Sequence, residues 1–261
     1  PHVGGPGRNL HGSIDRSNLG LTEIRSHVWM GVIWINLSDT APNFEDSMKD
    51  LIDRWADFDR PLFHGGSESS FTIEVAANWK LAVENYCESY HLPWVHPGLN
   101  TYSRLEDHYH IEHKNIFSGQ GTKVYKQLED KEGNSFPDFP NLNDKWDTAA
   151  EYIAVYPNVL LGVHRDHTFA IILIPDGPEK TYEHVHLFYS CKNTSKQLRR
   201  ENMKLWKNVF EEDVPVVQGM QKGRHAVKFD GGRFSPVMDS PTHCFHYWVA
   251  SEIQNGRKQK D

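Results

Sequence analysis

The chain has 261 residues, of which 38% are apolar and 24% charged, with a formal net charge of −7. This composition is typical of a globular protein that can bury a substantial core, and we expect one large domain rather than two. Acidic side chains outnumber basic ones by 35 to 28, which excludes the basic footprint of a protein that binds nucleic acid or an anionic membrane. The expected partner is therefore a small molecule.

No stretch of the sequence reaches the ~20 apolar residues that cross a bilayer, and the polar start PHVGGPGRNLHG lacks the apolar region of a signal peptide. We therefore expect a cytoplasmic protein. Because the sequence begins at Pro1 and not at Met, we expect it to be a fragment. Cys87, Cys191 and Cys244 form no closely spaced pair, so reduced and mostly buried thiols are expected.

The predicted elements begin with a β-type segment at residues 22–37, TEIRSHVWMGVIWINL, which is rich in Val, Ile and Trp. Its central Gly suits two short strands or one bulged ribbon. Residues 39–58 open with turn residues and continue with apolar side chains at helical spacing, which predicts a short amphipathic helix. These apolar positions are Met48, Leu51, Ile52 and Trp55.

The period of the sequence changes within residues 70–91. Phe71, Ile73 and Val75 alternate as in a strand, and the pattern becomes helical from Asn78 onward. Asn78 is a suitable helix N-cap, because its side-chain oxygen can accept a hydrogen bond from a free backbone N–H of the first turn.

The centre of the chain is expected to form a meander of antiparallel strands, since β-type runs alternate with Gly, Pro, Asp and Asn turn residues. Two helical patterns follow, of which the first is the longest in the chain. Strands bracketed by long helices predict an α+β fold, with a large antiparallel sheet wrapped around a helix. The runs are 108–114, 122–128, 151–163, 168–177 and 182–190, followed by the helices 195–223 and 242–254.

The segment ENYCESYHLPWVH contains two histidines and two carboxylates within thirteen residues. On a regular helix, Glu84, Glu88 and His91 would share one face, whereas His96 would lie about 140° away from His91. Pro93 is expected to break the helix just after His91, so that His96 can turn toward it. With one carboxylate from elsewhere, the two imidazoles would form a 2-His-1-carboxylate set, which is typical of non-haem Fe(II) sites.

The longer stretch NWKLAVENYCESYHLPWVH closely resembles the mononuclear-iron motif of the catalytic α subunits of Rieske non-haem iron oxygenases. In that motif an acid-x-x-His-x4-His unit follows an NWK helix start. The resemblance implies that His91 and His96 bind Fe(II). It also implies that Glu88 bridges two subunits, by accepting hydrogen bonds from His91 and from a cluster-binding histidine of the neighbouring subunit.

A second run, FEEDVPVVQGMQKGR, resembles the distal helix of the same family, in which an Asp precedes a Gln by eight residues. Asp213 precedes Gln221 by this interval, and the resemblance implies that Asp213 is the third iron ligand. Glu211 and Glu212 are interpreted as solvated charges on the helix face, and as the alternatives if the register is one residue off. Gln218 departs from the family pattern, in which many members carry an acid.

The resemblance extends from about residue 22 to the end of the chain and implies a helix-grip, START-like catalytic domain at 38–261. The family's N-terminal domain binds a [2Fe–2S] Rieske cluster with two Cys and two His, and no cysteine pair here has the required spacing. Residues 1–37 are therefore expected to be the trailing end of that domain. The resemblance further implies O2, electrons from NAD(P)H through a reductase or ferredoxin, and a homotrimer.

The residues around the substrate are harder to predict, because aromatic side chains on helices and strands usually belong to the core. His164 and His167 are candidate substrate contacts, but structural histidines are the first interpretation. His108, His110 and His113 alternate along a predicted strand and match no role in the family. The aromatic candidates for a cavity wall are Tyr86, Tyr90, Trp94, Phe169, Phe188 and Tyr189.

Two other functions fit part of the same pattern. A zinc hydrolase also uses two His and a carboxylate, but such enzymes usually carry an acid within H-E-x-x-H, and none lies between His91 and His96. The same fold can hold a small apolar ligand without catalysis. For an oxygenase, the substrate is either an aromatic or heteroaromatic compound or a quaternary ammonium compound, which an aromatic cage would suit. The resemblance is compatible with hydroxylation, dihydroxylation and oxidative dealkylation of the substrate.

Overall fold

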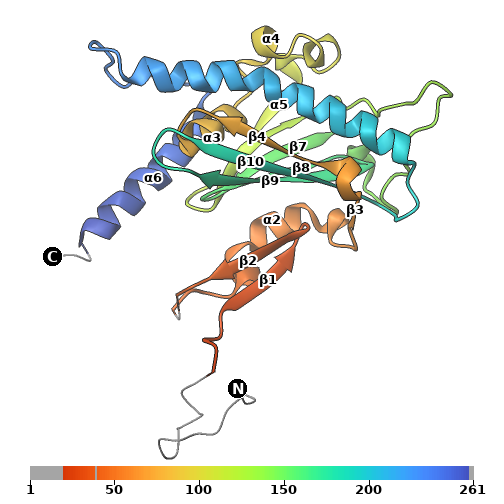
Figure 1. The fold of residues 1–261 in the computed structure, drawn as a ribbon, viewed down its shortest axis with the longest axis horizontal. Helices are drawn as coiled ribbons and strands as arrows, with labels where there is room; N and C mark the ends of the chain where they lie inside the picture. The colour runs from red at the N-terminus through yellow and green to blue at the C-terminus, as the bar shows by residue number, and fades with distance from the viewer. Residues whose placement is uncertain (1–19, 39, 259–261) are drawn as a thin grey trace, which may run out of the picture.

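A computed structural model describes residues 20–38 and 40–258, which form one large antiparallel sheet covered by helices on one face and by a small hairpin on the other (Figure 1). The strands are β1 (Arg25–Trp29), β2 (Val32–Asn36), β3 (Phe63–His64), β4 (Ser70–Val75), β5 (His108–His113), β6 (Phe117–Thr122), β7 (Ala150–Val155), β8 (Val159–Val163), β9 (His167–Pro175) and β10 (Thr181–Tyr189). The helices are α1 (Phe44–Ser47), α2 (Lys49–Arg54), α3 (Trp79–Cys87), α4 (Leu92–Val95), α5 (Lys196–Arg224) and α6 (Ser240–Lys258).

The large sheet has eight strands, and every pairing within it is antiparallel. Its order is β3-β10-β9-β8-β7-β6-β5, and β4 pairs with β10 on the same edge as β3. The long helix α5 runs across one face (Figure 1). The predicted α+β fold, with a large antiparallel sheet around a long helix, is confirmed.

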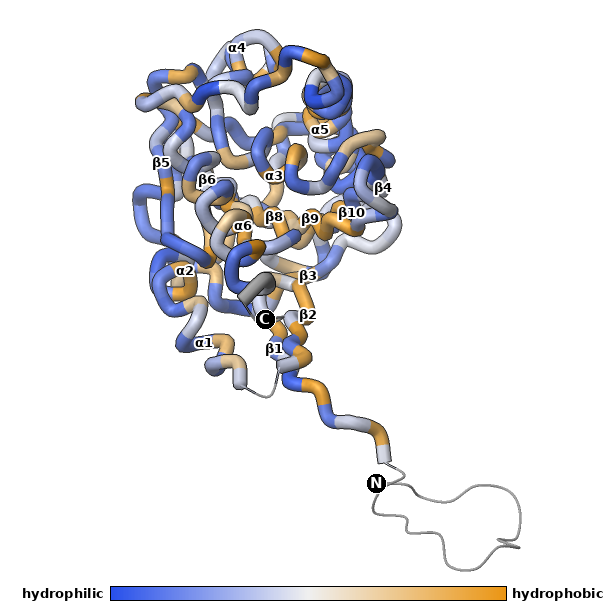
Figure 2. The backbone as a smooth tube through the Cα atoms, turned by 90° about the vertical axis from the view of Figure 1, so that its left-hand side faces the viewer, coloured by the Kyte–Doolittle hydropathy of each residue, from blue (hydrophilic) through white to orange (hydrophobic). Residues whose placement is uncertain are grey.

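Two hydrophobic cores lie on opposite faces of the sheet, because successive side chains of a strand point to opposite sides. Val185 and Leu187 of β10 pack beneath α3, α5 and α6, whereas Phe188 packs on the other face with the hairpin and α2. Strands β8, β9 and β10 are accordingly rich in apolar residues along their length (Figure 2). The core beneath α5 is the one that borders the site described below.

Residues 25–36 form the two short strands that were predicted, joined by a turn in which Met30 and Gly31 have φ values of 51° and 74°. Trp29 and Met30 are buried in the core with α2. The predicted domain segment 1–37 is described only from residue 20, and its earlier part lies outside the described residues. None of the helices among the described residues is long and apolar enough to cross a membrane.

The predicted helix at 39–58 is divided in two. Helices α1 and α2 meet at Met48, whose backbone has φ −100° and ψ 7°, and a short 3-10 turn follows at Ala56–Phe58. The predicted apolar face is nevertheless confirmed, since Leu51 and Trp55 are almost completely buried. Helices α5 and α6 confirm the two helical patterns at the end of the chain.

The strand predicted at 122–128 is wrong. The strand in this region is β6, which ends at Thr122, and the chain then leaves the sheet. A Cβ atom at Gly119 would lie 2.1 Å from the carbonyl oxygen of Tyr152, and one at Gly121 would lie 2.3 Å from the ring of Tyr109. Neighbouring groups therefore approach too closely for any side chain, so strand β6 requires glycine at both positions.

Candidate metal centre

The first histidine of the site lies between two helices and not on one. Helix α3 begins with Asn78 as its N-cap, as predicted, since the Asn78 side chain accepts a hydrogen bond from the Lys80 backbone N–H at 3.1 Å. The helix ends at Cys87, and Glu88 has an extended backbone with φ −124° and ψ 160°. The prediction that Glu84, Glu88 and His91 share a helical face is therefore wrong.

Pro93 starts a helix instead of ending one. It occupies the second position of α4, where a backbone N–H would have no partner within the helix, so its absence costs little. His91 is the N-cap of α4 and His96 is its C-cap, so one helical turn separates the two histidines. The expectation that the backbone near Pro93 lets His96 approach His91 is confirmed, although the mechanism differs.

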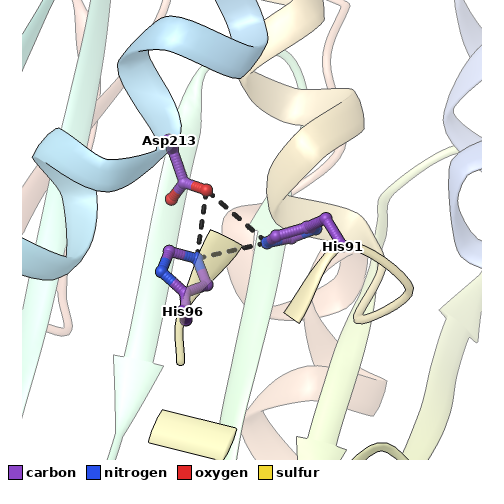
Figure 3. Close-up of side chains that lie close together, drawn as sticks. All are labelled: His91, His96 and Asp213. Atoms are coloured by element: carbon purple, nitrogen blue, oxygen red, sulfur yellow. Dashed lines mark hydrogen bonds and ion pairs between the residues drawn. The ribbon is translucent and has the colours of Figure 1, made fainter. Parts of the chain in front are cut away.

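Three side chains from these segments and from α5 converge (Figure 3). The Nε2 atoms of His91 and His96 lie 3.3 Å apart, and Asp213 Oδ1 lies 3.5 Å and 3.0 Å from them, respectively. One ligand atom of each residue thus lies within 4.8 Å of the others. His96 is almost completely buried, whereas His91 and Asp213 are partly exposed, which leaves one side of the group accessible.

Both imidazoles are held from behind by carboxylates. His91 Nδ1 lies 2.6 Å from Glu88 Oε1, and His96 Nδ1 lies 2.8 Å from Glu212 Oε2. Ionised carboxylates accept hydrogen bonds only, so each Nδ1 carries a hydrogen. In this tautomer the lone pair of a neutral ring lies on Nε2, which points inward. The expectation that Glu212 is merely a solvated charge is wrong, whereas Glu211 pairs with Lys207 on the helix surface as expected.

The three inward atoms form a donor set that suits a divalent cation. Asp213 Oδ1 is buried and has no hydrogen-bond partner among the described residues. Two imidazole lone pairs and a carboxylate oxygen at these separations repel one another unless a proton or a metal ion lies between them. Burial opposes a positive charge on His96, but the neighbouring Asp213 and Glu212 carboxylates raise its pKa overall. The residues present therefore fit a metal ion with three protein ligands.

A cavity opens beside the triad, lined by helix α5 along three turns. Asn202, Trp206 and Phe210 follow one another at helical spacing toward Asp213, which lines the end of the same stripe. The seven residues from Trp206 to Asp213 correspond to about 10 Å along the helix axis. The remaining wall comes from the α3–α4 segment, the chain that follows α4, strands β5 to β7, the chain that follows β6 and the start of β9. It includes Tyr86, Leu92, Tyr102, His108, Gln120, Thr122, Tyr125, Tyr152 and His167.

Residues 65–255 match the model of one protein family, the ring hydroxylating alpha subunit (catalytic domain). The chain belongs to this family. The match covers α3, α4 and α5 and so includes all three residues of the triad. The family membership implied by the two sequence motifs is confirmed.

The relatives of this ring-hydroxylating α subunit include oxygenases of quaternary ammonium compounds. It is 23% identical over 214 residues to the carnitine monooxygenase oxygenase subunit of Acinetobacter pittii, covering 81% of this chain and 55% of the relative. It is 25% identical over 245 residues to the chloroplastic choline monooxygenase of Atriplex hortensis, covering 91% and 52%, respectively. The chain thus spans about half the length of these curated relatives.

Solved structures with a similar fold include the quaternary ammonium Rieske monooxygenase CntA. The inhibitor complex of CntA matches with a TM-score of 0.69 and 20% identity, over 93% of this chain and 64% of that chain. The complex with L-carnitine matches with a TM-score of 0.65 and 21% identity, over 88% and 60%, respectively. At this level of identity the likeness establishes the fold of the α subunit.

The aromatic residues expected around the cavity divide into three groups. Of the six candidates, Tyr86 alone lines the cavity. Tyr90 and Trp94 are 50% and 70% exposed, with ring centroids 5.4 Å apart on the outside of α4. The other candidates are buried in the two cores, namely Phe169, Phe188 and Tyr189.

The histidine candidates differ in whether they line the cavity. His167 and His108 line the cavity, whereas His164 is buried behind it, in contact with the hydroxyl of Tyr152 at 3.1 Å. Burial lowers the pKa values of His108 and His164, so both rings are neutral near pH 7. His110 contacts Ser240 and His113 contacts Asp50, and neither lies on the cavity wall.

Sequence reasoning missed several cavity residues that come from β6, β7 and the loop after β6. Tyr125 and Tyr152 lie in segments that were predicted to be ordinary strands, and nothing local distinguishes them. Gln120 of β6 has a specific role, since its amide donates to the backbone oxygen of Glu88 at 3.0 Å and accepts from His108 at 2.6 Å. Asn202 and Trp206 could have been identified from the sequence, because they lie at helical spacing before Asp213 on the same predicted helix.

Proposed function

We propose that this chain is the catalytic part of an oxygenase that binds Fe(II) through His91, His96 and Asp213 and oxidises a small quaternary ammonium compound with O2. The observation that carries the proposal is the triad itself, in which three potential ligand atoms converge beside a cavity. Three protein ligands leave coordination positions free, and Fe(II) held in this way supplies the reduction of O2 when substrate and electrons are present.

The protein residues orient and isolate this chemistry. Glu88 and Glu212 hold the two imidazoles in the tautomer that donates Nε2 to a metal. Gln120 fixes the backbone of Glu88, and the buried aromatic wall keeps water from much of the cavity. The substrate is held near the metal by the wall and need not be a ligand of it.

The chemistry of the wall favours a methylated cation over a substrate that needs many hydrogen bonds. Four aromatic residues of the cavity already have hydrogen-bond partners for their polar atoms. Tyr86 donates to the backbone oxygen of Leu161, and Tyr125 donates to Asp166. Trp206 donates to His167, and the Tyr152 hydroxyl contacts His164. The wall therefore offers ring faces, which attract a cation that lacks N–H donors, although Lys126 also lines the cavity and adds one positive charge to it. The names of the carnitine and choline monooxygenases among its relatives support the same class. An aromatic or heteroaromatic substrate is the second candidate, because the same rings can stack.

A zinc hydrolase is disfavoured by the placement of the acids. Such an enzyme needs a carboxylate base on the open side of the metal. Glu88 and Glu212 instead lie behind the imidazoles and are bonded to their Nδ1 atoms. A module that only binds a ligand would not require three converging metal ligands.

The iron proposal is tested by metal analysis after anaerobic loading with Fe(II). The parent protein should bind about one iron per chain, as three protein ligands predict. His91→Ala and His96→Ala should bind almost none and keep the circular dichroism of the parent protein. His110→Ala, whose ring contacts Ser240 and does not line the cavity, is the matched control and should bind iron normally. Full iron in both ligand variants, or a preference for zinc, would remove the proposal.

The electron supply is proposed to come from outside the described residues. We propose that residues 1–37 end a domain that holds a [2Fe–2S] Rieske cluster, that NAD(P)H supplies electrons through a reductase or ferredoxin in the cytoplasm, and that the assembly is a homotrimer. In support, the hairpin β1–β2 is a separate two-stranded sheet, and the relatives are about twice as long as this chain. Substrate-dependent O2 consumption by the complete protein with a surrogate reductase tests this, and choline, carnitine and benzoate distinguish the substrate classes.

Glu88 is proposed to couple the cluster of a neighbouring subunit to this iron. Its carboxylate is 15% exposed and holds His91 through both ring and backbone, so it touches the ligand and still reaches the surface. Glu88→Gln should retain iron, whereas the reoxidation of the cluster with substrate and O2 should slow in the complete protein. Stopped-flow absorbance measures this rate, and a parent-like rate would assign Glu88 a purely local role.

A further inference from the structure

Asp166 is a buried acid that the proposed chemistry does not use. It lies in the turn between β8 and β9 and is 0% exposed. Its Oδ1 atom accepts hydrogen bonds from the Tyr125 hydroxyl at 2.9 Å and from His167 Nδ1 at 2.7 Å. Its Oδ2 atom is also buried and has no hydrogen-bond partner within the described ranges. A buried carboxylate with an unpaired oxygen is costly, and such a group calls for an explanation.

The imidazole of His167 does not neutralise this carboxylate. The indole N–H of Trp206 points at His167 Nε2 at a distance of 2.8 Å. An indole N–H can only donate, so Nε2 must accept, and the single hydrogen of the ring is the one that Nδ1 donates to Asp166. His167 is thereby fixed as a neutral ring between an indole and a carboxylate.

The two nearby guanidinium groups are engaged elsewhere. Arg165, the preceding residue, donates to the Asp138 side chain at 2.9 Å and to the backbone oxygen of Asp147 at 3.0 Å. Arg199 donates to the backbone oxygen and hydroxyl of Thr194 at 2.6 Å and 2.8 Å. No Lys or Arg of the described residues lies within 4 Å of the Asp166 carboxylate. Within the described part of the chain, the Asp166 carboxylate therefore has no direct partner among the Lys and Arg side chains.

The residues bonded to Asp166 face the cavity. Tyr125 and His167 both line it, as does Trp206, which bonds to His167 from the other side. Their ring centroids are close, at 6.2 Å for Tyr125 and His167 and 5.8 Å for His167 and Trp206. Asp166 is thus separated from the cavity by one layer of aromatic rings. Hydrogen bonds hold the Tyr125 hydroxyl and the His167 Nδ1–H toward the carboxylate.

We propose that Asp166 is the specificity-determining counter-charge of the cavity, which favours a cationic substrate at the Tyr125–His167–Trp206 wall. This inference rests on the proposed function and identifies the residue that selects the charge. A negative charge behind a low-polarity wall acts over several ångströms, because little water is present to screen it. The cavity wall has no exposed acid in this region that would serve instead, since Asp213, the acid among the lining residues, belongs to the metal triad.

The test compares two ligands of the same shape. Choline and 3,3-dimethylbutan-1-ol differ by the exchange of a quaternary nitrogen for a carbon, so they differ in charge and hardly in volume. Isothermal titration calorimetry measures the binding of each to the iron-loaded protein under anaerobic conditions. The parent protein should prefer choline. Asp166→Asn keeps the acceptor oxygen for Tyr125 and His167 and should weaken choline binding by on the order of tenfold, with little effect on the alcohol.

A matched control removes an exposed charge from a neighbour of Arg165, the residue that precedes Asp166. Asp147→Asn changes an exposed acid beside Arg165 and should leave both affinities unchanged, because its charge is screened by water. If Asp166→Asn does not fold, the salt dependence of the parent protein decides. The preference for choline should persist from 0.05 to 0.5 M NaCl if a buried carboxylate causes it. A preference caused by surface charge should weaken, because the screening length in water is only about 10 Å at 0.1 M.

The outcomes separate the inference from the proposed function. If the parent protein prefers choline and Asp166→Asn retains that preference, the substrate class stands and the role of Asp166 is refuted. If the parent protein binds both ligands equally or binds neither, both the substrate class and the counter-charge are refuted. A choline preference that disappears with Asp166→Asn and persists with Asp147→Asn supports both.

Discussion

At the scale of single residues, Glu212 and Asp213 are neighbours on α5 but serve the site in different ways. Consecutive helical side chains point about 100° apart, so only one of them can face the centre of the triad. Asp213 does, whereas Glu212 reaches around to the Nδ1 atom of His96 and remains 42% exposed. The Asp213–Gln221 interval predicted that Asp213 joins the two histidines, and its Oδ1 atom does lie beside both Nε2 atoms. It could not reveal the contact of Glu212, which depends on where α4 places His96.

This contact leads to a prediction about metal affinity. Glu212→Ala should weaken metal binding by roughly 10- to 100-fold, because His96 loses the partner that orients its ring. Asp213→Ala should abolish binding, because a ligand is lost. Competition with a chelator measures both dissociation constants. Glu211→Ala, which removes only the surface pair with Lys207, should bind metal like the parent protein, and a parent-like result for Glu212→Ala would contradict an orienting role.

A second prediction at this scale concerns Cys87. Burial raises the pKa of its thiol to about 12, and its side chain is completely buried beneath the helices. The native protein at pH 8 should therefore react with a thiol reagent only at Cys191 and Cys244, which are partly exposed. Absorbance after reaction with 5,5′-dithiobis(2-nitrobenzoic acid) counts the thiols. The third should appear only in denaturant, and Cys87→Ser should not change the native count; rapid native reaction of all three thiols would show that Cys87 is accessible.

At the scale of elements, the long amphipathic patterns were predictable and the elements at the site were not. Helices α5 and α6 and the strands β7 to β10 have periodic apolar residues that the core requires. Strand β6 has the sequence FSGQGT, and its polar residues are buried because Gln120 and Thr122 line the cavity. Its glycines allow neighbouring strands and rings to approach. Local propensity fails here because the tertiary environment determines the choice of residues.

The end of α3 was mispredicted for a related reason. The apolar and polar spacing of the sequence continues to His91, but the helix stops at Cys87 and Glu88 becomes extended. In that conformation the Glu88 carboxylate accepts hydrogen bonds from the ring N–H and the backbone N–H of His91. Glu88 therefore stabilises the segment before α4 and does not extend α3. These compensating bonds are visible only in three dimensions.

The start of α3 gives a prediction about stability. Asn78 caps the helix through its side-chain oxygen, while its amide group donates to the Pro178 backbone oxygen and its backbone N–H to Gln221. Asn78→Ala should lower the free energy of unfolding by about 1 kcal/mol, as for other N-caps. Asn78→Asp keeps the capping oxygen and should lose less. Urea denaturation measures both, and equal losses would assign the stabilisation to the Pro178 contact and not to the cap.

At the scale of the whole molecule, one sheet separates two cores and carries the cavity on its helical side. The strands nearest the cavity bury polar side chains, among them two stacked histidines, His164 and His167, with ring centroids 4.3 Å apart. The rings lie between β8, β9 and α5, so they are buried only when sheet and helix have assembled. Their protonation is therefore linked to the folding of the entire domain.

This linkage gives a prediction about stability and pH. Burial lowers the pKa of His164 well below its ordinary value of 6.5, and the adjacent His167 lowers it further. Below pH 6.5 the unfolded chain takes up a proton at this position that the native protein does not, so acidification favours unfolding. Between pH 7.5 and 5.5, this group alone should reduce the free energy of unfolding by about 1.4 kcal/mol.

The contribution of His164 can be isolated by comparing two variants with the parent protein. His164→Gln has no titrating group and keeps a polar atom near the Tyr152 hydroxyl, so its loss of stability from pH 7.5 to 5.5 should be smaller than that of the parent protein by about 1.4 kcal/mol. His225→Gln alters an exposed histidine paired with Glu179 and is the control, for which the parent pH dependence should remain. Urea denaturation of the metal-free proteins at pH 7.5, 6.5 and 5.5 measures the three curves. Parallel curves for His164→Gln and the parent protein would mean that His164 is protonated inside the fold, and the neutral stacked pair behind the cavity would then have to be abandoned.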